Sequence, residues 1–505
     1  MNKKIKHITA ILILILGIQS CDDYVDILPP GRENSEDYFN SSDDYENALI
    51  GVYDLLSTTY LNNILGEIAS DNSLCGGENA TDVLDWQQID DMIHTPDNGA
   101  LRNIFQWMYA GISRANYIME FKNKTDFEGK DQIIAENLFL RSYFYFELVK
   151  FFGDVPLYTD KRITIEETQA IDRTPKAEVY AQLEQDLLTA IDDLPWQQSQ
   201  PGKVTKGAAL ALLGKIYLFQ DKFSESASVL NEVIESGQYS LIQDFSTIFL
   251  NENENNAESV FEIQYFGGSE GASFDCFVCV EGNIAVGFMG PRFRGGNYEP
   301  YDDGYSFNIP VQELVDLYEP GDTRLDATIF NIEDFVASHP DVTYLKGDAH
   351  TGYFNKKYIP YDEAILEDSH INHSNNYRAI RYSDVLLMAA EANLRATTPV
   401  RDPQALLDAV RDRAFGDTNH RVPATLENIW LERRLELAGE GQRFFDLIRT
   451  GKAEEEIENN NGIDRLDDGT LEVDKTFEAK NVLFPIPRIE IELAGNRWEQ
   501  NPGYN

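Results

Sequence analysis

Residues 208–237 read AALALLGKIYLFQDKFSESASVLNEVIESG, and this stretch carries the pattern that decides the fold. Apolar residues recur at helical spacing on both sides of a short polar turn, which predicts two consecutive helices. Gly214 and Ser226 are small, and small residues let two antiparallel helices approach each other closely. Tyr217 and Phe223 supply rings that fill the space beside that contact. We therefore expect a tightly packed helical pair here.

The spacing of these residues matches a tetratricopeptide repeat, which places small and aromatic residues at the same positions. A generic αα-hairpin is the alternative. In either case one pair cannot bury its apolar face alone, so neighbouring helical pairs must stack on it. Helical periodicity fills two blocks, about residues 43–237 and 378–449, and is dense in ENLFLRSYFYFELVKFF at 136–152. The chain is therefore predicted to be mostly α-helical, with tetratricopeptide-like helix pairs as its scaffold.

The character of the sequence changes between the two helical blocks, from about residue 240 to 375. Gly, Asn, Asp and aromatic residues become frequent, and SVFEIQYF at 259–266 alternates as a strand does. The stretch GFMGPRFRGGNYEPYDDGYSFNIP at 287–310 is too rich in Gly, Pro and Asp to form a long helix. Because long loops in compact domains usually serve a function, we expect this loop-rich segment, with a few short strands, to carry a ligand site. The closing segment, residues 480–505, is broken by prolines and is expected to pack extended against the helices.

The chain is strongly acidic, with a formal net charge of −44 and a pI near 4.4. Such a surface repels nucleic acid phosphates, so binding of DNA or RNA is not expected. Polyanionic ligands are disfavoured for the same reason, although a local basic pocket can still hold one.

The N-terminus is typical of an exported protein. Three lysines precede the apolar run ITAILILILGI at residues 8–18, which is too short to span a bilayer and suits a signal peptide. The sequence IQSC at 18–21 resembles a bacterial lipobox, which predicts a signal peptide at residues 1–20 and a lipid chain on Cys21. An ordinary secretory signal with a chance cysteine is the alternative.

Neither a metal nor a cofactor is required by any motif. Cys276 and Cys279 form a C-x2-C pair without further cysteine or histidine ligands at zinc spacing, so we expect a local disulfide or two inert thiols. The acidic-amide loop LNENENNAES at 250–259 offers oxygens to Ca²⁺ but lacks the spacing of an EF-hand. A solvated turn is the favoured interpretation of that loop, and a structural Ca²⁺ is the alternative.

Five motifs in order carry a resemblance to a known family. They are LRSYFYFELVKFFGDVPLY (140–158), IRYSDVLLMAAEA (380–392), LERRLELAGEGQRFFDLIRTGKA (431–453), LFPIPRIEIELAGN (483–496) and QNPGY (500–504). In this order they are similar to the SusD/RagB family of surface glycan-binding lipoproteins of Bacteroidetes. The resemblance implies one SusD-like α-helical domain over residues 21–505, an outer-membrane location facing the cell exterior, and a SusC-like TonB-dependent transporter as partner. The acidic pair Asp22 and Asp23 resembles the signal that sends such lipoproteins to the outer face.

The charges of the third motif have a structural explanation. Glu440, Arg443 and Asp446 recur at i+3 spacing, and together with Glu432, Arg433 and Glu436 they predict a partly buried ion network on a helix that joins its neighbours. A pair of glycosidase carboxylates is the alternative. Because the charges lie in the most helical part of the chain and no catalytic motif is present, we do not expect an enzyme.

A sugar ring needs an aromatic platform beside amide, carboxylate or guanidinium groups. Two loop-rich stretches, residues 69–90 and 287–310, supply such groups, whereas Trp107 is assigned to the core. The family commonly has binding aromatics where Trp86 stands, so the resemblance favours that residue. The candidate ligand-binding residues are Asp71, Asn72, Trp86, Phe288, Arg292, Arg294, Tyr298, Tyr301 and Tyr305.

Three functions follow as hypotheses. The first is capture of oligosaccharides for delivery to the transporter, the second is capture of peptides or glycopeptides as in the RagB branch, and the third is glycoside hydrolysis. Arg292 and Arg294 suit a uronate polymer such as alginate, or they pair with Asp302 or Asp303. The charge of −44 favours a neutral glycan.

Overall fold

The computed structural model describes residues 38–267, 276–362, 371–459 and 475–504. The predicted signal peptide, Cys21 and the two aspartates behind it lie outside the described residues. Within the described ranges no helix combines the length and the apolar character that crossing a membrane requires.

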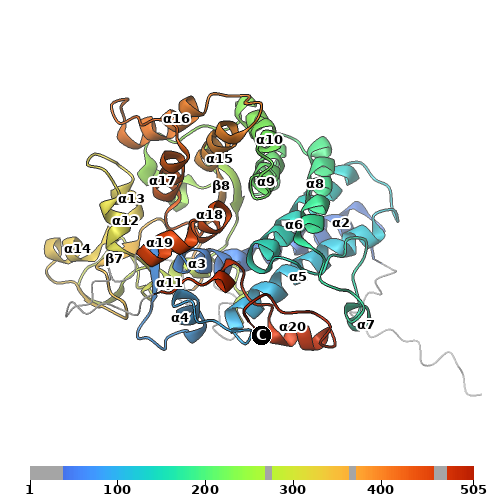
Figure 1. Cartoon of the computed structure of the whole chain (residues 1–505), viewed down its shortest axis with the longest axis horizontal. Coiled ribbons are helices and arrows are strands. Elements are labelled where there is room, and N and C mark those ends of the chain that lie inside the picture. Colours follow the sequence, from blue (N-terminus) through green and yellow to red (C-terminus); the bar gives the residue numbers. More distant parts are fainter. Residues whose placement is uncertain (1–37, 268–275, 363–370, 460–474, 505) are drawn as a thin grey trace, which may run out of the picture.

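Helices dominate the chain and the strands are few and short, which confirms the predicted fold class (Figure 1). The N-terminal part contains α2 (Ser42–Asp54), α3 (Tyr60–Ile68), α4 (Leu84–Asp90), α5 (Gly99–Phe121), α6 (Lys130–Phe152), α7 (Ile165–Thr168), α8 (Lys176–Asp193), α9 (Lys206–Leu218) and α10 (Phe223–Glu235). The C-terminal part contains α15 (Tyr382–Arg395), α16 (Pro403–Phe415), α17 (Leu426–Leu437), α18 (Arg443–Thr450), α19 (Ala453–Asn459) and α20 (Arg488–Leu493). Between them lie the short helices α11 (Ile284–Phe288), α12 (Gln312–Asp316), α13 (Leu325–Thr328) and α14 (Ile332–Ser338).

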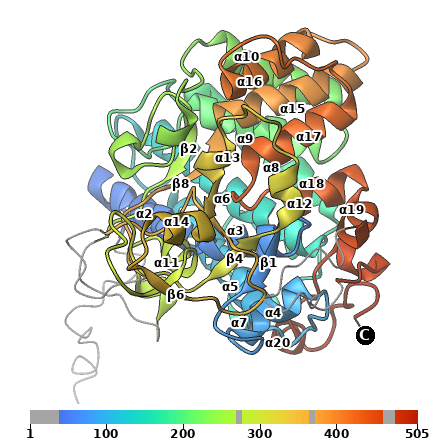
Figure 2. The ribbon, with the colours of Figure 1, turned by 90° about the vertical axis from the view of Figure 1, so that its left-hand side faces the viewer.

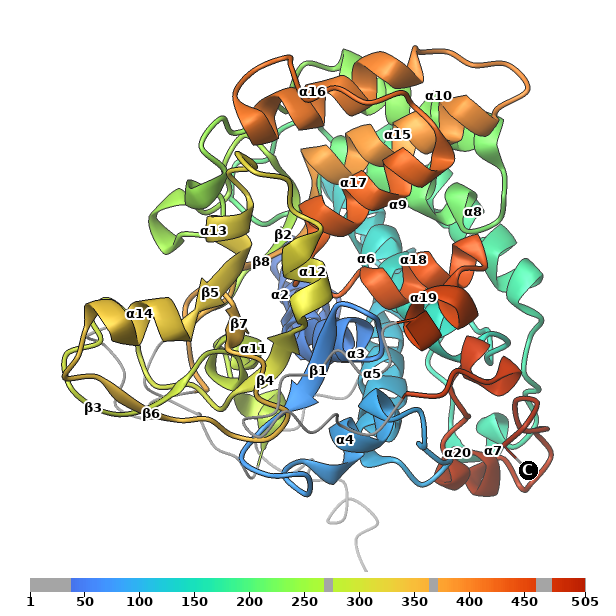
Figure 3. The ribbon, with the colours of Figure 1, turned by 60° about the vertical axis from the view of Figure 1, so that its left-hand side comes forward.

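Helices α9 and α10 form the tight pair that residues 208–237 predict. A Cβ atom on Gly214 would lie 2.5 Å from the Leu230 side chain, so only glycine permits this approach. The Ser226 hydroxyl donates to the Gly214 carbonyl at 2.8 Å. Further helices stack on both sides of the pair, since α8 packs on α9 and α15 packs on α10 (Figures 1 and 3).

In the part of the chain that the structure describes, four antiparallel two-stranded sheets lie among the loops. They are β1 (Ser73–Gly76) with β4 (Phe307–Pro310), β2 (Ser259–Ile263) with β8 (Tyr377–Arg381), β3 (Arg292–Gly295) with β6 (Thr343–Leu345), and β5 (Ile329–Asn331) with β7 (Tyr353–Asn355). Strand β2 falls where SVFEIQYF predicts a strand. Figure 2 shows β1 beside β4, and their pairing sets Leu74 opposite Ile309. This sheet brings together the two loop-rich stretches that the sequence separates by about 200 residues.

A buried ion network joins the helical scaffold to the loop-rich segment. Arg381, at the end of β8, donates to Glu258, Glu436 and Glu440 at 2.6 to 2.8 Å. Arg324, which precedes α13, donates to Glu436 at 3.0 Å. All five side chains are almost fully buried, so each charge depends on its partners in place of water.

Glu440, Arg443 and Asp446 belong to this network, as their spacing predicts. Arg443 binds Asp71 and Asp446 binds Arg433, and both carboxylates are largely buried. Burial by itself would raise the pKa of each aspartate, but the neighbouring arginines hold both pKa values well below the usual range.

The expectation of one helix through these charges is wrong, because α17 ends at Leu437 and α18 begins only at Arg443. Gly439 and Gly441 in between have φ angles of +81° and +74°, which interrupt a helix. Helix α3 crosses this turn so closely that a Cβ on Gly66 would lie 2.2 Å from the Gly441 carbonyl oxygen.

The closing segment is not extended throughout, since α20 forms directly after Pro487. Proline suits the start of a helix because its φ angle is already helical and it has no N–H to satisfy. The segment is held to the scaffold by a hydrogen bond of 2.8 Å from the Phe484 N–H to the Phe151 carbonyl.

Candidate functional site

The first and second loop-rich stretches enclose a hollow of about 410 Å³. Its walls come from α4, from the start of α3 and α5, from α11, and from the 3-10 turn η5 (Phe277–Cys279). The residues that line it are Tyr60, Leu61, Glu78, Asp82, Val83, Asp85, Trp86, Ala100, Asn103, Phe277, Phe288, Arg292, Tyr305 and Phe307.

A cluster of aromatic rings forms the floor of this hollow. Trp86 packs against Phe288 at 4.8 Å and edge-on against Phe307 at 5.1 Å between ring centroids. Phe288 in turn contacts Tyr305 at 5.7 Å and Phe277 at 6.4 Å. Trp86 and Phe288 are each 5% exposed, whereas Tyr305 and Phe277 are half-buried. The accessible aromatic surface therefore belongs mainly to Tyr305 and Phe277.

Polar groups stand at the rim. Arg292 donates to Asp82 at 2.8 Å and lies 3.9 Å from Glu78. Its guanidinium also lies 5.3 Å from the centre of the Tyr305 ring. Its Nε atom has no hydrogen-bond partner among the described residues, which leaves one buried donor beside the hollow. Among the described residues that line the hollow, Glu78, Asp82 and Asp85 supply three carboxylates against one arginine, so the charge of the described rim is negative.

The disulfide between Cys276 and Cys279 confirms one of the two interpretations of the C-x2-C pair. It closes the η5 turn, which presents Phe277 to the hollow and leaves Val278 47% exposed. The cysteines therefore fix the position of a ring at the candidate site.

Asp71 and Asn72 do not reach the hollow. Asp71 accepts two hydrogen bonds of 2.7 Å from Arg443. Asn72 is fully buried, accepts from Arg434 at 2.8 Å and donates to Glu67 at 3.0 Å. Both side chains are occupied in the interior of the protein.

Tyr298, Tyr301 and Arg294 also lie away from the hollow, in a separate cluster around β3 and α14. Tyr298 stacks on Phe293 with 4.4 Å between centroids, and Tyr301 packs on the aromatic side chains of the same cluster. Arg294 pairs with Asp303 at 3.2 Å, which is one of the partners that the sequence suggests. Trp86, Phe288, Arg292 and Tyr305 are thus the predicted residues that the structure gathers at one site.

Ten of the fourteen lining residues are not among the candidates from the sequence, and Phe277, Tyr60 and Asn103 are examples. Phe277 is hidden between the two cysteines, Tyr60 lies in an apolar helical pattern, and Asn103 lies on the polar side of α5. Trp107, one turn further along α5, is half-buried and lies 6.2 Å from Tyr60 between ring centroids. Aromatic residues flanking a closed C-x2-C turn are the signal that could have identified Phe277.

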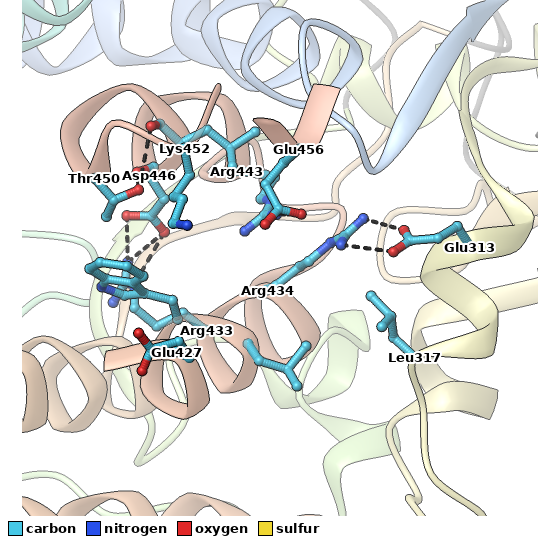
Figure 4. A pocket seen from close by; sticks show the side chains of 13 residues that line it. Glu313, Leu317, Glu427, Arg433, Arg434, Arg443, Asp446, Thr450, Lys452 and Glu456 are labelled. Carbon is cyan, nitrogen blue, oxygen red and sulfur yellow. Dashed lines mark hydrogen bonds and ion pairs between the residues drawn. The ribbon is translucent and has the colours of Figure 1, made fainter. Parts of the chain in front are cut away.

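A second hollow of about 230 Å³ lies between α12, α17, α18 and α19 (Figure 4). Its arginines already have partners, since Arg434 binds Glu313 and Arg433 binds Asp446. The second hollow is therefore lined by side chains of the ion network that already bind one another.

Glu436 and Glu440 lie one helical turn apart in sequence, as the carboxylate pair of a glycosidase could, but arginines bind both of them. Glu436 and Glu440 are buried and each is bound by arginine. Burial would raise the pKa of Glu436, but Arg413, Arg381 and Arg324 hold it well below the usual range. A carboxyl with such a pKa stays ionised and cannot act as a general acid near neutral pH.

The loop at 250–259 is partly solvated, because Glu252 and Asn255 are exposed, and its other polar groups bond to the protein. The Asn255 N–H donates to Glu262, and the Asn251 amide donates to Ser374 at 2.9 Å. Across the described residues, no three His, Cys, Asp or Glu side chains are grouped so that they could hold a metal ion.

Two family profiles match the chain. The SusD family matches residues 257–504, and a family described as starch-binding and associating with the outer membrane matches residues 23–218. SusD-like protein P2 of Formosa agariphila is 27% identical over 534 residues, which cover 99% of this chain and 100% of the relative.

Solved structures agree over almost the whole chain. A laminarin-binding SusD-like protein is 32% identical with a TM-score of 0.80, and the match covers 92% of this chain and 100% of that one. Surface glycan-binding protein A from Bacteroides thetaiotaomicron, solved in complex with laminarihexaose, is 27% identical with a TM-score of 0.80, covering 91% and 99%. With the five motifs, the helical scaffold and these matches in agreement, the chain belongs to the SusD family.

Proposed function

We propose that this protein captures a neutral glycan at the cell surface and passes it to a SusC-like TonB-dependent transporter. The observation that carries the proposal is the hollow at Trp86, where half-buried rings of Tyr305 and Phe277 stand beside carboxylate, amide and guanidinium groups. A pyranose ring offers apolar C–H groups to such rings and hydroxyls to such a rim. Relatives named for binding laminarin and surface glycans support the ligand class.

A neutral glycan fits better than a uronate polymer. Arg292 is paired with Asp82, and Glu78 and Asp85 add further negative charge at the rim. A uronate would have to displace a carboxylate from Arg292 and approach a chain of net charge −44.

Binding should be measured by affinity electrophoresis in gels that contain laminarin, other neutral glucans or alginate. Wild type is expected to be retarded by at least one neutral glucan, while Tyr305→Ala and Phe277→Ala should weaken binding at least ~10-fold, or about 1.4 kcal/mol. Tyr298→Ala is the matched control, because its ring is also half-buried but lies in the separate cluster around β3. Retardation by alginate alone, or an equal loss in Tyr298→Ala, would contradict the proposed site.

Peptide capture is the competing outcome of the same experiment. If no glycan binds and titration with peptides gives saturable binding, the RagB-like function replaces the proposed one. Such a peptide would add to a free strand edge.

The location is proposed from Cys21. A lipid-anchored protein should be cleaved before Cys21 and recovered with the outer membrane, whereas Cys21→Ala should be unprocessed or released. A Cys21→Ala protein that remains in the membrane fraction at the mature size would refute the anchor. Co-purification of the anchored wild type with a TonB-dependent transporter tests the partner.

A further inference from the structure

A third hollow, outside the site described above, has the composition of a carbohydrate site. It has a volume of about 360 Å³ and lies where the loops at one end of α8, α9 and α10 meet strand β2. Strand β2 packs directly against α9. We call this hollow the Trp196 groove.

Two aromatic rings are held in place in the Trp196 groove. Trp196 follows the end of α8, where a hydrogen bond of 2.8 Å from the Lys206 N–H to the Pro195 carbonyl fixes the backbone. Its ring is half-buried. Tyr239 follows α10, and its hydroxyl lies 3.0 Å from the Thr205 hydroxyl.

Uncharged amides surround these rings. Gln197 donates to Gln238 at 2.8 Å, and both side chains are exposed. Gln200, also exposed, makes no hydrogen bond with any described residue. Asn255 has a φ angle of +51° and exchanges amide hydrogen bonds of 2.9 and 3.1 Å with Gln264. Each amide offers both donors and acceptors, which is what a polyhydroxyl ligand requires.

The charged groups of the groove are already paired. Lys203 binds Glu46 at 2.5 Å. Glu262 is 3% exposed and accepts from the Asn255 N–H and from the Asn376 amide. The lining is therefore mainly aromatic and amide, which suits an uncharged glycan, and the Lys206 ammonium lies 5.9 Å from the centre of the Trp196 ring.

An intermediate hollow and two segments of the chain lie between the Trp196 groove and the hollow at Trp86. An intermediate hollow of about 310 Å³ shares Gln200, Lys203 and Glu262 with the Trp196 groove. The intermediate hollow shares no lining residue with the hollow at Trp86, but two segments contribute residues to both. They are residues 56–61, which span the end of a 3-10 turn and the start of α3, and residues 277–281, which include η5. The three hollows are therefore neighbours along these segments.

We propose that the Trp196 groove is a second glycan subsite, which holds a distant part of a polysaccharide chain whose other part occupies the hollow at Trp86. The proposal rests on the proposed function, and it adds that the protein prefers polymers to short oligosaccharides. Two linked contacts act as a bivalent ligand, so the second contact raises affinity without any change at the first.

The test is calorimetric titration of the mature protein with laminarihexaose and with laminarin. Wild type should bind laminarin more tightly than the hexasaccharide. Trp196→Ala should leave the laminarihexaose affinity within about twofold and lower the laminarin affinity roughly tenfold, toward that of the hexasaccharide. Gln197→Ala combined with Gln200→Ala should also lower the laminarin affinity and leave the laminarihexaose affinity unchanged. Both side chains are exposed, so this double variant should fold as wild type does. Trp430→Ala, which removes a half-buried tryptophan from α17, is the matched control.

The possible results separate the two proposals. If wild type binds both ligands equally, or if the groove variants bind laminarin as wild type does, the second subsite is refuted and the proposed function stands. If Trp196→Ala weakens both ligands to the same extent, the groove is the primary site and the proposal is refuted as well. If wild type binds neither ligand nor any other neutral glucan, the proposed function fails and the second subsite fails with it.

Discussion

Arg443 joins two segments that lie 372 positions apart, because it holds both oxygens of Asp71. Arg443→Ala would leave a buried carboxylate short of a partner, so we expect a loss of ~3–5 kcal/mol in the free energy of unfolding. The control is Arg294→Ala, whose side chain is 44% exposed and pairs with Asp303 at 3.2 Å. An exposed pair contributes less than ~1 kcal/mol. Urea denaturation of the two variants measures both values, and equal losses would show that the network is not buried.

Asp91, directly after α4, makes the stability of the folded protein depend on pH, and the direction of that dependence follows from its pKa. Burial and the charge of Asp90 raise the pKa of Asp91 to about 6, above the value of about 3.9 in an unfolded chain. The protonated form is therefore favoured by folding, and its stabilisation is complete below about pH 4 and lost as the pH rises through 6.

Asp91→Asn removes this titration. Because Asp91 is only half-buried, solvent screening reduces the effect, and the variant should be more stable than wild type by ~1 kcal/mol at pH 7.5. The difference should shrink toward zero at pH 4. The melting temperatures of wild type and Asp91→Asn at pH 7.5 and pH 4 test this prediction. A larger difference at pH 4 than at pH 7.5 would contradict it.

Single residues also show what sequence reasoning can select, since four of the candidates line one hollow. Trp86, Phe288, Arg292 and Tyr305 were predicted as candidates because they are aromatic or basic in loop-rich stretches. Asp71 fits the same chemistry, but its partner Arg443 is distant in sequence, and no local pattern indicates that contact.

The turn between α17 and α18 shows how an element boundary depends on two glycines. Gly441 has a φ of +74°, and a Cβ there would lie 2.6 Å from backbone atoms of Asn63. Gly441→Ala should therefore lower the free energy of unfolding for two reasons. An alanine with left-handed backbone angles costs ~1–2 kcal/mol, and the contact of its Cβ with Asn63 costs a further ~1–3 kcal/mol. Gly416→Ala is the matched control, since Gly416 has a φ of +72° with nothing within 4 Å. If both variants unfold at the same urea concentration, α3 does not press on this turn.

The η5 turn should depend on its disulfide for ligand binding. Reduction frees Phe277, and ordering one such side chain on binding costs ~0.5–1.5 kcal/mol, so glycan affinity should fall several-fold. The control is Cys276→Ser with Cys279→Ser, whose affinity should already be reduced and should not respond to reductant. Unchanged affinity of reduced wild type would mean that Phe277 does not contact the ligand.

At the level of elements, local patterns predicted the helices and missed the sheets that organise the site. The α9–α10 pair follows from the spacing within residues 208–237. The β1–β4 pairing joins Leu74 to Ile309, and no sequence period extends over that separation. The helix through 432–446 was mispredicted because positive φ at Gly439 and Gly441 outweighs the charge spacing.

For the molecule as a whole, the net charge of −44 and the paired arginine at the rim favour an uncharged ligand. The affinity for a neutral glycan, which binds through ring contacts and hydroxyl hydrogen bonds, should not change with salt. The affinity for a polyanion falls because salt screens the charges. The net charge, which the composition alone gives, therefore favours a neutral glycan over a polyanion as ligand.

Capture of a neutral glycan at the hollow around Trp86 is tested most directly by calorimetric titration of wild type and Tyr305→Ala. The ligand is an oligosaccharide of the neutral glucan that retards wild type in the gel, and the buffers contain 50 mM or 500 mM NaCl, about threefold below and above the physiological salt concentration. We expect saturable binding by wild type, with an affinity that differs by less than about twofold between the two salt concentrations. Tyr305→Ala should lose at least ~10-fold in affinity, or about 1.4 kcal/mol. Binding that is unaffected by Tyr305→Ala, or that appears only with an anionic polymer and disappears in 500 mM NaCl, would contradict the capture of a neutral glycan at this hollow.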